Sequence, residues 1–444
     1  MMEEEGENKG ARISGVVTGF IDYTPQEQCL FHSFMEKVKK AYELFGFTPL
    51  HLRPFERMAA LQGEGETQKQ IFEVFRKDTQ KTTSLGLPFD HTVPLALWVA
   101  EHAGHWQHLA LPYKRYDMGM VYRGERPKTG RCRAFVQADV DIVGRKLPLS
   151  ADAECLLAVF HALNSLSVGR FILHLNHLGV VRSVLRFHEI EEKEHAPLLR
   201  AIDKLDKLSK EEVLQEISRT TGLSSLKQKR VLDVFTEEVS LQDPSIATIY
   251  GPDAMLAIGE INLLITLLLE GGIPKEQIHF SLHRVRGLAY YTGVVFETFL
   301  EDKESYGSMA SGGRYSNLVG DFAKGLAEVE GVGASIGITR LLDVLIKTGF
   351  VPPACQSNAQ ILVGARTEEL ATLAARAAQS LRAKGIRVDL YSGPCKVKQI
   401  LGHADALGVP KAILVMDVNA FVLKEMHSKS QSEYSSIEAL IEAL

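Results

Sequence analysis

The stretch VYRGERPKTGRCRAFVQADVDIVG, residues 121–144, consists of two β-like runs on either side of a loop rich in cations. Five basic residues occupy the end of the first run and the loop: Arg123, Arg126, Lys128, Arg131 and Arg133. Arginine pairs bidentately with phosphate oxygens through a planar guanidinium that is always charged. The stretch therefore predicts a β-hairpin that binds a polyphosphate. A solvated hairpin with scattered surface charge is the alternative.

The second run, residues 134–142, places Gln137, Asp139 and Asp141 two residues apart. Side chains two residues apart in a strand point to the same face. The run thus predicts a polar, acidic row beside the cationic loop. Such a row is unusual for a strand that only packs against its neighbours.

The bulk composition is that of a globular protein with more than one domain. The chain has 444 residues, more than a single core normally supports. The net charge of -5 gives no general attraction to nucleic acid, so such a partner requires local basic surfaces. Five scattered cysteines without a CxxC pair argue against a disulfide framework and suit a reducing cytosol. With an acidic N-terminus and no apolar run of membrane-spanning length, we expect a soluble cytoplasmic protein without membrane contact.

Changes in composition divide the chain into a leader and two domains. Residues 1–18 are expected to form a mobile leader, and residues 19–348 the first domain. Within it, residues 187–245 are rich in Lys, Glu, Leu and Asp and predict a helical insertion. Beyond a proline-bearing connector, residues 358–444 alternate strand and helix patterns, which predicts a small α/β domain with a largely parallel sheet.

Two further clusters combine residues that bind ligands in other proteins. The segment RGLAYYTG, residues 286–293, has an arginine, two tyrosines and two glycines, so it is either a site for a small polar ligand or a tight turn with aromatic packing. In SIGITR, residues 335–340, Arg340 alone predicts no more than a surface charge. His102, His105 and His108 lack an acidic or Cys partner, so we expect no metal centre built from protein side chains.

Taken in order, these clusters resemble a class II aminoacyl-tRNA synthetase, and most closely the histidyl-tRNA synthetase family. The resemblance covers nearly the whole chain from Gly19. The segments that carry it are GFTPLHLRPFER (46–57) for the first class motif, the opening stretch for the second, GVGASIGITRLL (331–342) for the third, RVRGLAYYTGVVFE (284–297) and SGGRYSNLV (311–319) for segments of the histidine enzymes, and LRAKGIRVDLY (381–391) for the anticodon-binding domain.

The resemblance implies an α+β fold in which an antiparallel sheet flanked by helices carries the helical insertion, followed by a C-terminal α/β anticodon-binding domain. It also implies a homodimeric histidine–tRNA ligase. Such an enzyme activates histidine with ATP, accompanied by Mg2+, and transfers it to the 3′ end of tRNA(His). Lys396 and Lys398, at the start of a helix, are candidate tRNA contacts, and a solvated helix start is the alternative reading.

For the nucleotide, the resemblance implies that Arg123 holds the α-phosphate of ATP, Glu125 the adenine side and Arg340 the γ-phosphate. Arg131 belongs to the same ATP site. Arg123 and Arg286 are the implied catalytic residues, because fixed guanidinium groups stabilise the charge that builds on the phosphate oxygens.

For the amino acid, Asp90, Thr92 and Gln137 match positions that hold the substrate α-amino group. Asp141 and Tyr291 match the pair that reads the imidazole, an acceptor for one ring nitrogen and a hydroxyl for the other. Tyr290 and Arg286 are assigned to the same histidine site.

The chain departs from the family pattern at four positions: Ala289 and Ser316 replace aspartates, Pro88 an arginine and Thr339 a glutamate. These departures leave room for a non-catalytic histidine-binding paralogue that regulates histidine biosynthesis, like the regulatory subunit of ATP phosphoribosyltransferase. Such paralogues usually lack the C-terminal domain and lose the second-motif arginines, which are retained here as Arg123, Arg131 and Arg133. The ligase is therefore the favoured prediction.

Overall fold

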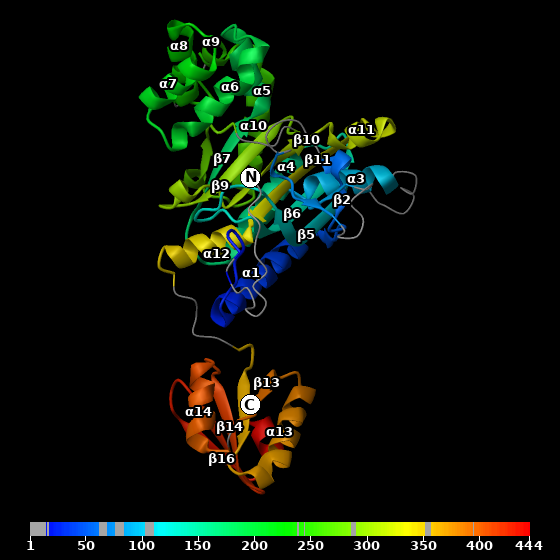
Figure 1. Cartoon of the computed structure of the whole chain (residues 1–444), viewed down its shortest axis with the longest axis vertical. Coiled ribbons are helices and arrows are strands. Elements are labelled where there is room, and N and C mark those ends of the chain that lie inside the picture. The colour runs from blue at the N-terminus through cyan, green and yellow to red at the C-terminus, as the bar shows by residue number, and fades with distance from the viewer. Residues whose placement is uncertain are drawn as a thin grey trace, which may run out of the picture. The chain divides into compact units, whose positions relative to one another are not determined.

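The computed structural model describes residues 15, 17–61, 69–75, 84–102, 111–237, 239–243, 245–285, 290–350, 357–393 and 395–444. Contacts between residues divide the chain into two compact units, residues 1–21 with 34–348 and residues 22–33 with 349–444. Each unit is built on its own sheet (Figure 1). No helix in the described ranges has the length and apolar character that a membrane span requires.

The first unit contains an eight-stranded sheet in the order β1-β5-β6-β11-β10-β9-β7-β8. Its strands are β1 Thr48–Pro49, β5 Tyr113–Tyr122, β6 Ala134–Arg145, β7 Phe171–His177, β8 Ile278–Phe280, β9 Val294–Leu300, β10 Ala310–Tyr315 and β11 Val329–Gly337. The six inner strands pair antiparallel, as the α+β prediction requires. The edge strands differ, because β1 pairs parallel to β5 and β8 parallel to β7. Helices separate the members of both parallel pairs, as a crossover connection requires.

The predicted hairpin is the pair β5–β6. Its register runs from Tyr113 opposite Val143 to Tyr122 opposite Ala134, and a bridge between Lys128 and Arg131 closes the loop. On its other side β6 pairs with β11, so the polar row of β6 lies in the interior of the sheet. The prediction of a hairpin is confirmed.

Helices cover both faces of this sheet (Figure 1). On one face, Tyr42 of α1 (Pro25–Leu44) donates a hydrogen bond to the carbonyl of Ala138, and α4 (Leu149–Ser165) packs on β6 and β11. On the other face, an apolar cluster joins α3 (Thr92–His102) and α11 (Leu318–Phe322) to Val143. Further helices are α2 Met58–Leu61, α5 Leu178–Phe187, α10 Ala254–Glu270 and α12 Ile338–Lys347, and a small sheet joins β2 Glu56–Arg57, β4 Leu85–Gly86 and β3 Glu73–Val74.

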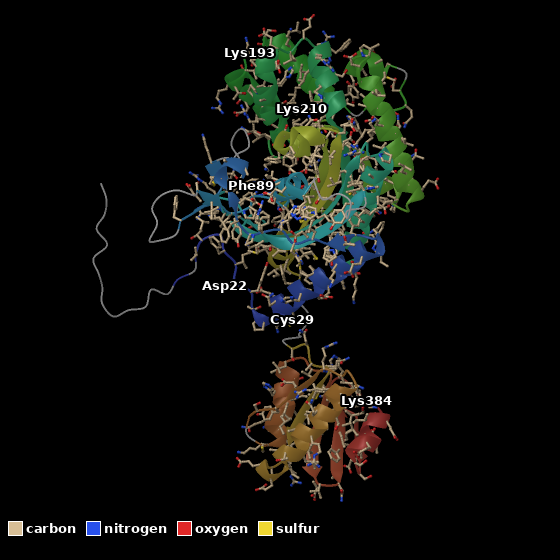
Figure 2. The ribbon with its side chains drawn as sticks, turned by 90° about the vertical axis from the view of Figure 1, so that its right-hand side faces the viewer. Asp22, Cys29, Phe89, Lys193, Lys210 and Lys384 are labelled. Carbon is tan, nitrogen blue, oxygen red and sulfur yellow. The ribbon has the colours of Figure 1, made fainter. Side chains whose placement is uncertain are left out.

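The segment expected to form the insertion contains helices at one end of the unit, with Lys193 and Lys210 on their outer surface (Figure 2). They are α6 Glu192–Ile202, α7 Lys210–Thr220 and α8 Ser225–Thr236, and α9 Ile246–Tyr250 follows directly after the segment. A capping box between Ser209 and Glu212 begins α7, where each residue satisfies a backbone N–H of the other.

The second unit has a five-stranded sheet in the order β13-β12-β14-β15-β16. Its elements are β12 Ile361–Ala365, α13 Ala371–Ala383, β13 Val388–Leu390, α14 Val397–Ala406, β14 Lys411–Asp417, β15 Ala420–Glu425, β16 Gln431–Tyr434 and α15 Ile437–Glu442. The first three strands of the order are parallel, and β15 and β16 add antiparallel pairs. Apolar clusters pack α13 and α15 on one face and α14 on the other. The assignment of this unit as an anticodon-binding domain stays a prediction.

Candidate active site

Two adjoining cavities lie over the polar face of β6. The outer cavity is the larger, and the inner cavity extends from it past Asp139 and Asp141. The residues that line both are Arg123, Gln137, Tyr291, Ser311 and Ser335. Because these five residues form a shared boundary, a molecule in each cavity would meet the other there.

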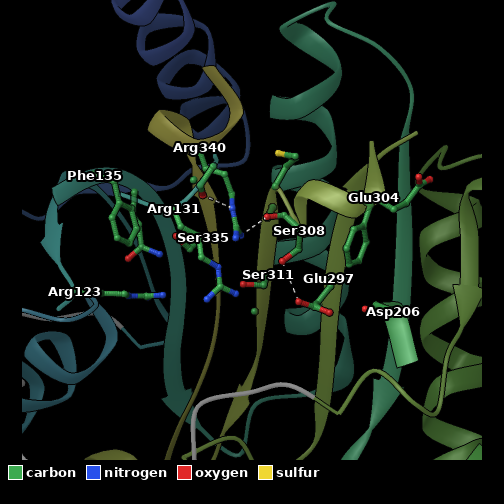
Figure 3. Close-up of a pocket in the computed structure, with 18 of the residues that line it drawn as sticks. Arg123, Arg131, Phe135, Asp206, Glu297, Glu304, Ser308, Ser311, Ser335 and Arg340 are labelled. Atoms are coloured by element: carbon green, nitrogen blue, oxygen red, sulfur yellow. Dashed lines mark hydrogen bonds between the residues drawn. The ribbon is translucent and has the colours of Figure 1, made fainter. Parts of the chain in front are cut away.

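One wall of the outer cavity is cationic. Figure 3 shows Arg123, Arg131 and Arg340 on one side, opposite the acidic side chains of the other wall. Arg123 directly follows β5, and its Nε donates to the carbonyl of Phe89 at 3.2 Å. Its guanidinium lies over the rings of Phe89 and Phe135, with centroids 4.3 and 5.2 Å away. The aromatic contacts hold the guanidinium in one orientation while leaving its other N–H groups available to an anion.

Arg340 reaches the same cavity from the first turn of α12. Its Nε donates to the carbonyl of Gly130 at 2.8 Å and its Nη1 to that of Ser308 at 2.7 Å (Figure 3). Burial, together with the charges of Arg131 and Arg123, lowers the pKa of Arg340 to about 10. Three guanidinium groups that repel one another create a site that an anion with several charges would stabilise.

Hydrogen bonds and an ion pair fix the loop of the hairpin, both within the loop and between its tip and α12. Glu125 pairs with Arg131 at 2.7 Å, and Arg133 donates from its Nε to the backbone carbonyl of Glu125 at 3.3 Å. At the tip, the N–H of Gly130 donates to Asp343 of α12 at 2.6 Å. The loop that would contact a nucleotide is therefore connected to the helix that carries Arg340.

The opposite wall of the outer cavity is acidic and comes from three separate segments. Glu297 lies on β9 and accepts a hydrogen bond from Ser308 Oγ at 2.9 Å, while Glu304 follows β9 (Figure 3). Asp206, from the end of the helical segment after α6, pairs with Arg284 at 3.0 Å. Within the described residues no group of three or more His, Cys, Asp or Glu side chains is placed to hold a metal ion.

Asp90 lines the inner cavity and lies two residues before the start of α3. Its Oδ1 accepts the backbone N–H groups of Thr92 and Val93 at 3.2 and 3.0 Å. Its Oδ2 accepts the hydroxyl of Tyr290 at 3.3 Å. The rings of Tyr290 and Tyr291 meet edge to face, 4.9 Å apart, and burial raises the pKa of both hydroxyls. Both tyrosines are therefore neutral hydrogen-bonding groups at neutral pH.

At the inner end of this cavity, Asp141 is held by two neighbours. Its Oδ1 accepts the hydroxyl of Tyr315 at 2.9 Å, and its Oδ2 lies 2.7 Å from Nη2 of Arg115. Burial raises the pKa of Asp141, and the charge of Arg115 opposes that shift. Burial works against the charge of Arg115 as well, but Asp141, Asp139 and Asp117 together raise its pKa. This ion pair holds Asp141 in one position and opposes its protonation.

The structure sorts the predicted site residues between the cavities. Those assigned to ATP line the outer cavity: Arg123, Glu125, Arg131 and Arg340. Those assigned to histidine line the inner one: Asp90, Thr92, Gln137, Asp141, Tyr290 and Tyr291. Arg286 lies outside the described residues, as do Ala289, His105 and His108. His102 stacks on Trp98 with ring centroids 4.7 Å apart.

The sequence prediction missed Arg115, Tyr315 and Asp206. Arg115 and Asp117 alternate on β5 as Asp139 and Asp141 do on β6, so the period of two was a signal for them. Tyr315 belongs to a segment that was singled out, but its contact with Asp141 depends on strands distant in sequence. Asp206 carried no signal, because only the folded chain brings it beside Arg284.

Three of the four departures from the family pattern have hydrogen-bond partners among the described residues. Thr339 is buried, and its Oγ1 accepts the backbone N–H of Val136 on β6 at 2.9 Å. Ser316 accepts a hydrogen bond from Thr292 through its hydroxyl at 2.9 Å. Pro88 contributes its carbonyl to the N–H of Tyr122.

Comparisons with known proteins agree with one another. Residues 19–341 match the sequence model of the family described as histidyl-tRNA synthetase. A curated relative from Wolinella succinogenes, named histidine–tRNA ligase, is 35% identical over 447 residues, covering 96% of this chain and 97% of the relative. The crystal structure of histidyl-tRNA synthetase from a Nostoc species has a TM-score of 0.84 at 29% identity, covering 97% of this chain and 99% of that one. A Bacillus halodurans structure, described as an ATP phosphoribosyltransferase regulatory subunit/histidyl-tRNA synthetase, has a TM-score of 0.69 at 20% identity over 92% of this chain and 98% of its own, and shows the fold alone.

Proposed function

Because the chain belongs to the histidyl-tRNA synthetase family, we propose that its adjoining cavities hold ATP and histidine for the first step of a histidine–tRNA ligase. The chain is an aminoacyl-tRNA ligase that activates histidine with ATP and transfers it to tRNA(His). The observation that supports the division of labour is the shared boundary, where residues such as Arg123 and Gln137 line both cavities.

In the first step, an oxygen of the histidine carboxylate attacks the α-phosphorus of ATP. The new carboxyl–phosphorus bond gives histidyl-adenylate, and the bond from that phosphorus to the bridging oxygen breaks to release pyrophosphate. Arg123 holds the α-phosphate and Arg340 the γ-phosphate. Glu125 contacts the adenine side of ATP, and Arg131 belongs to the same ATP site. The fixed guanidinium groups stabilise the charge that develops on the phosphate oxygens. Arg286 acts with Arg123 at the reacting carboxylate.

In the histidine site, Asp90, Thr92 and Gln137 hold the α-amino group, and Asp141 with Tyr291 reads the imidazole. Tyr290 supports this site through its hydrogen bond with Asp90. A site built from buried polar groups discriminates strongly, because an analogue without the matching donors leaves those groups unpaired.

In the second step, the 3′-terminal ribose hydroxyl of the tRNA attacks the carbonyl carbon of the adenylate and AMP leaves. Glu297 and Glu304 would hold the Mg2+ that accompanies ATP, which would offset the negative charge of the phosphates. The tRNA also contacts Lys396 and Lys398 of the second unit. The protein works as a homodimer in the cytoplasm.

Histidine-dependent exchange between ATP and labelled pyrophosphate tests this proposal. We expect exchange with the purified protein and its loss, with the fold intact by circular dichroism, in Arg286→Ala. Absence of exchange in the folded wild-type protein would favour the regulatory paralogue instead. Unchanged exchange in Arg286→Ala would remove Arg286 from the catalytic assignment.

A further inference from the structure

Asp139 lies in the middle of the polar row of β6 and has no role in the proposed function. It is 4% exposed, and it lines the inner cavity but not the outer one. Its neighbours in the row, Gln137 and Asp141, lie two residues away on either side and face the same cavity. Asp139 therefore faces the inner cavity between Gln137, at the shared boundary, and Asp141, at the inner end.

One oxygen of this carboxylate is unpaired. Asp139 Oδ1 is buried without a hydrogen-bond partner among the described residues. Ser335 lies opposite Asp139 on β11, in register with it, but neither Ser335 Oγ nor Asp139 Oδ1 forms a hydrogen bond with any described residue. A buried acceptor left unpaired costs about 1–3 kcal/mol, so its persistence calls for a donor brought by a ligand.

The buried cation Arg115 is engaged with other groups through Nη2, while its Nε and Nη1 are buried without a hydrogen-bond partner among the described residues. Nη2 of Arg115 lies 2.7 Å from Asp141 and donates to the carbonyl of His91 at 3.1 Å. Asp117, directly opposite Asp139 on β5, pairs with His51 at 2.8 Å. Three buried carboxylates, Asp117, Asp139 and Asp141, thus surround one fully buried guanidinium. The excess of negative charge favours a ligand that presents N–H groups and positive charge.

We propose that Asp139 is a further specificity-determining residue, whose Oδ1 shares with Asp141 the ring N–H of the imidazole of the bound histidine, while the Tyr291 hydroxyl faces the other ring nitrogen. Asp141 Oδ1 already accepts the Tyr315 hydroxyl, and Asp141 Oδ2, although it too has no hydrogen-bond partner, lies 2.7 Å from Nη2 of Arg115. Asp139 Oδ1 has neither kind of partner among the described residues, so its full accepting capacity is available. The two carboxylates together present acceptors to the ring along one strand, and the ring supplies the donor that Asp139 lacks. This inference rests on the proposed function, because it takes histidine as the occupant of the inner cavity.

The test is a thermodynamic cycle that combines substitution of Asp139 with removal of the ring N–H from the ligand. The dissociation constants of L-histidine and of β-(4-thiazolyl)alanine, whose ring has a nitrogen acceptor but no N–H, are measured by calorimetry without ATP for the wild type and Asp139→Asn. We expect Asp139→Asn to weaken histidine binding about 10- to 100-fold and to change binding of the thiazole analogue by less than threefold, since one charged hydrogen bond is worth about 1.5–3 kcal/mol.

Asp117→Asn is the matched control, because Asp117 lies opposite Asp139 but does not line the inner cavity. This control should change the affinities for both ligands by the same factor. Asp139→Ser, which is smaller and cannot donate through an amide, repeats the cycle in case the asparagine variant folds poorly.

Equal losses for the two ligands in the Asp139 variants would mean that Asp139 only supports the strand, which overturns the proposal. Unchanged histidine affinity in both variants would mean that Asp139 Oδ1 is paired only with water, which also overturns the proposal. Failure of the proposed function looks different: the wild type would then show no histidine-dependent exchange, or would not bind histidine at all.

Discussion

Gly333 on β11 lies directly opposite Asp141 on β6, and a Cβ on Gly333 would stand 2.0 Å from Asp141 Oδ1. Asp141 has little freedom to move away, because Tyr315 and Arg115 hold its two oxygens. The absence of a side chain at residue 333 therefore makes room for the carboxylate assigned to the imidazole. A second glycine on β11 also makes room for a neighbour, since a Cβ on Gly331 would stand 2.0 Å from the ring of Tyr315.

Gly333→Ala is expected to raise the KM for histidine in the exchange reaction at least 10-fold and to lower the free energy of unfolding by about 1–3 kcal/mol through overpacking. Since Gly333 does not line the outer cavity, the KM for ATP should stay within twofold of the wild-type value. Gly259→Ala is the control, because Gly259 lies in α10 with nothing within 4 Å of the added Cβ. That substitution should stabilise the protein by up to about 1 kcal/mol. A normal histidine KM in Gly333→Ala would show that Asp141 does not need its observed position.

Asp139 makes the stability of the ligand-free protein depend on pH. Burial raises its pKa from the ordinary value of 3.8 to about 6, and nearby Asp141 adds to that shift, while His91 and Arg115 oppose it. The folded state thus binds more protons than the unfolded state between about pH 4 and pH 6. Stability consequently falls as pH rises through this window, and the cost is complete above pH 6. The other charged or titratable groups around this carboxylate are Tyr42, Asp117, Arg123 and Tyr291.

Asp139→Asn removes the ionisation, so it is expected to raise the stability of the ligand-free protein at pH 7.5 by about 1–3 kcal/mol, the order given by a shift of about two pKa units. The gain should vanish near pH 4, where the wild-type carboxyl is protonated. Thermal unfolding of both proteins at the two pH values measures the difference. An equal loss of stability at both values would contradict the assignment of a buried, charged carboxylate.

The hairpin and the period-two row could be predicted because both are local patterns, in which residues near in sequence share a strand. The partners of that row could not. Arg115 meets Asp141 only through the register of β5 and β6, and Tyr315 reaches it from β10 across β11. The parallel edge strands were missed for the same reason. When two strands pair across a helical crossover, neither strand's own sequence contains a local pattern that identifies its partner.

Thr339 extends the ladder of β6 beyond the end of β11, because its hydroxyl oxygen accepts the N–H of Val136. Thr339→Val keeps the shape but leaves that N–H unpaired, so we expect a loss of about 1–3 kcal/mol in the free energy of unfolding. Thr339→Ser keeps the acceptor and should cost less than the valine variant. Denaturant unfolding measures both, and equal stability of the two variants would show that the hydrogen bond contributes nothing.

Lys396 and Lys398 are exposed at the start of α14, on the face of the second sheet opposite α13. If they contact tRNA phosphates, Lys396→Glu/Lys398→Glu should raise the KM for tRNA(His) at least 10-fold and lower the slope of log affinity against log salt by about two. Histidine-dependent exchange needs no tRNA, so it should be unchanged. Lys384→Glu/Lys429→Glu alters the charge equally, with Lys384 at the end of α13 on the surface of the unit (Figure 2). Equal loss of aminoacylation in both double variants would indicate a general effect of charge, whereas loss in the first alone assigns the tRNA contact to the start of α14.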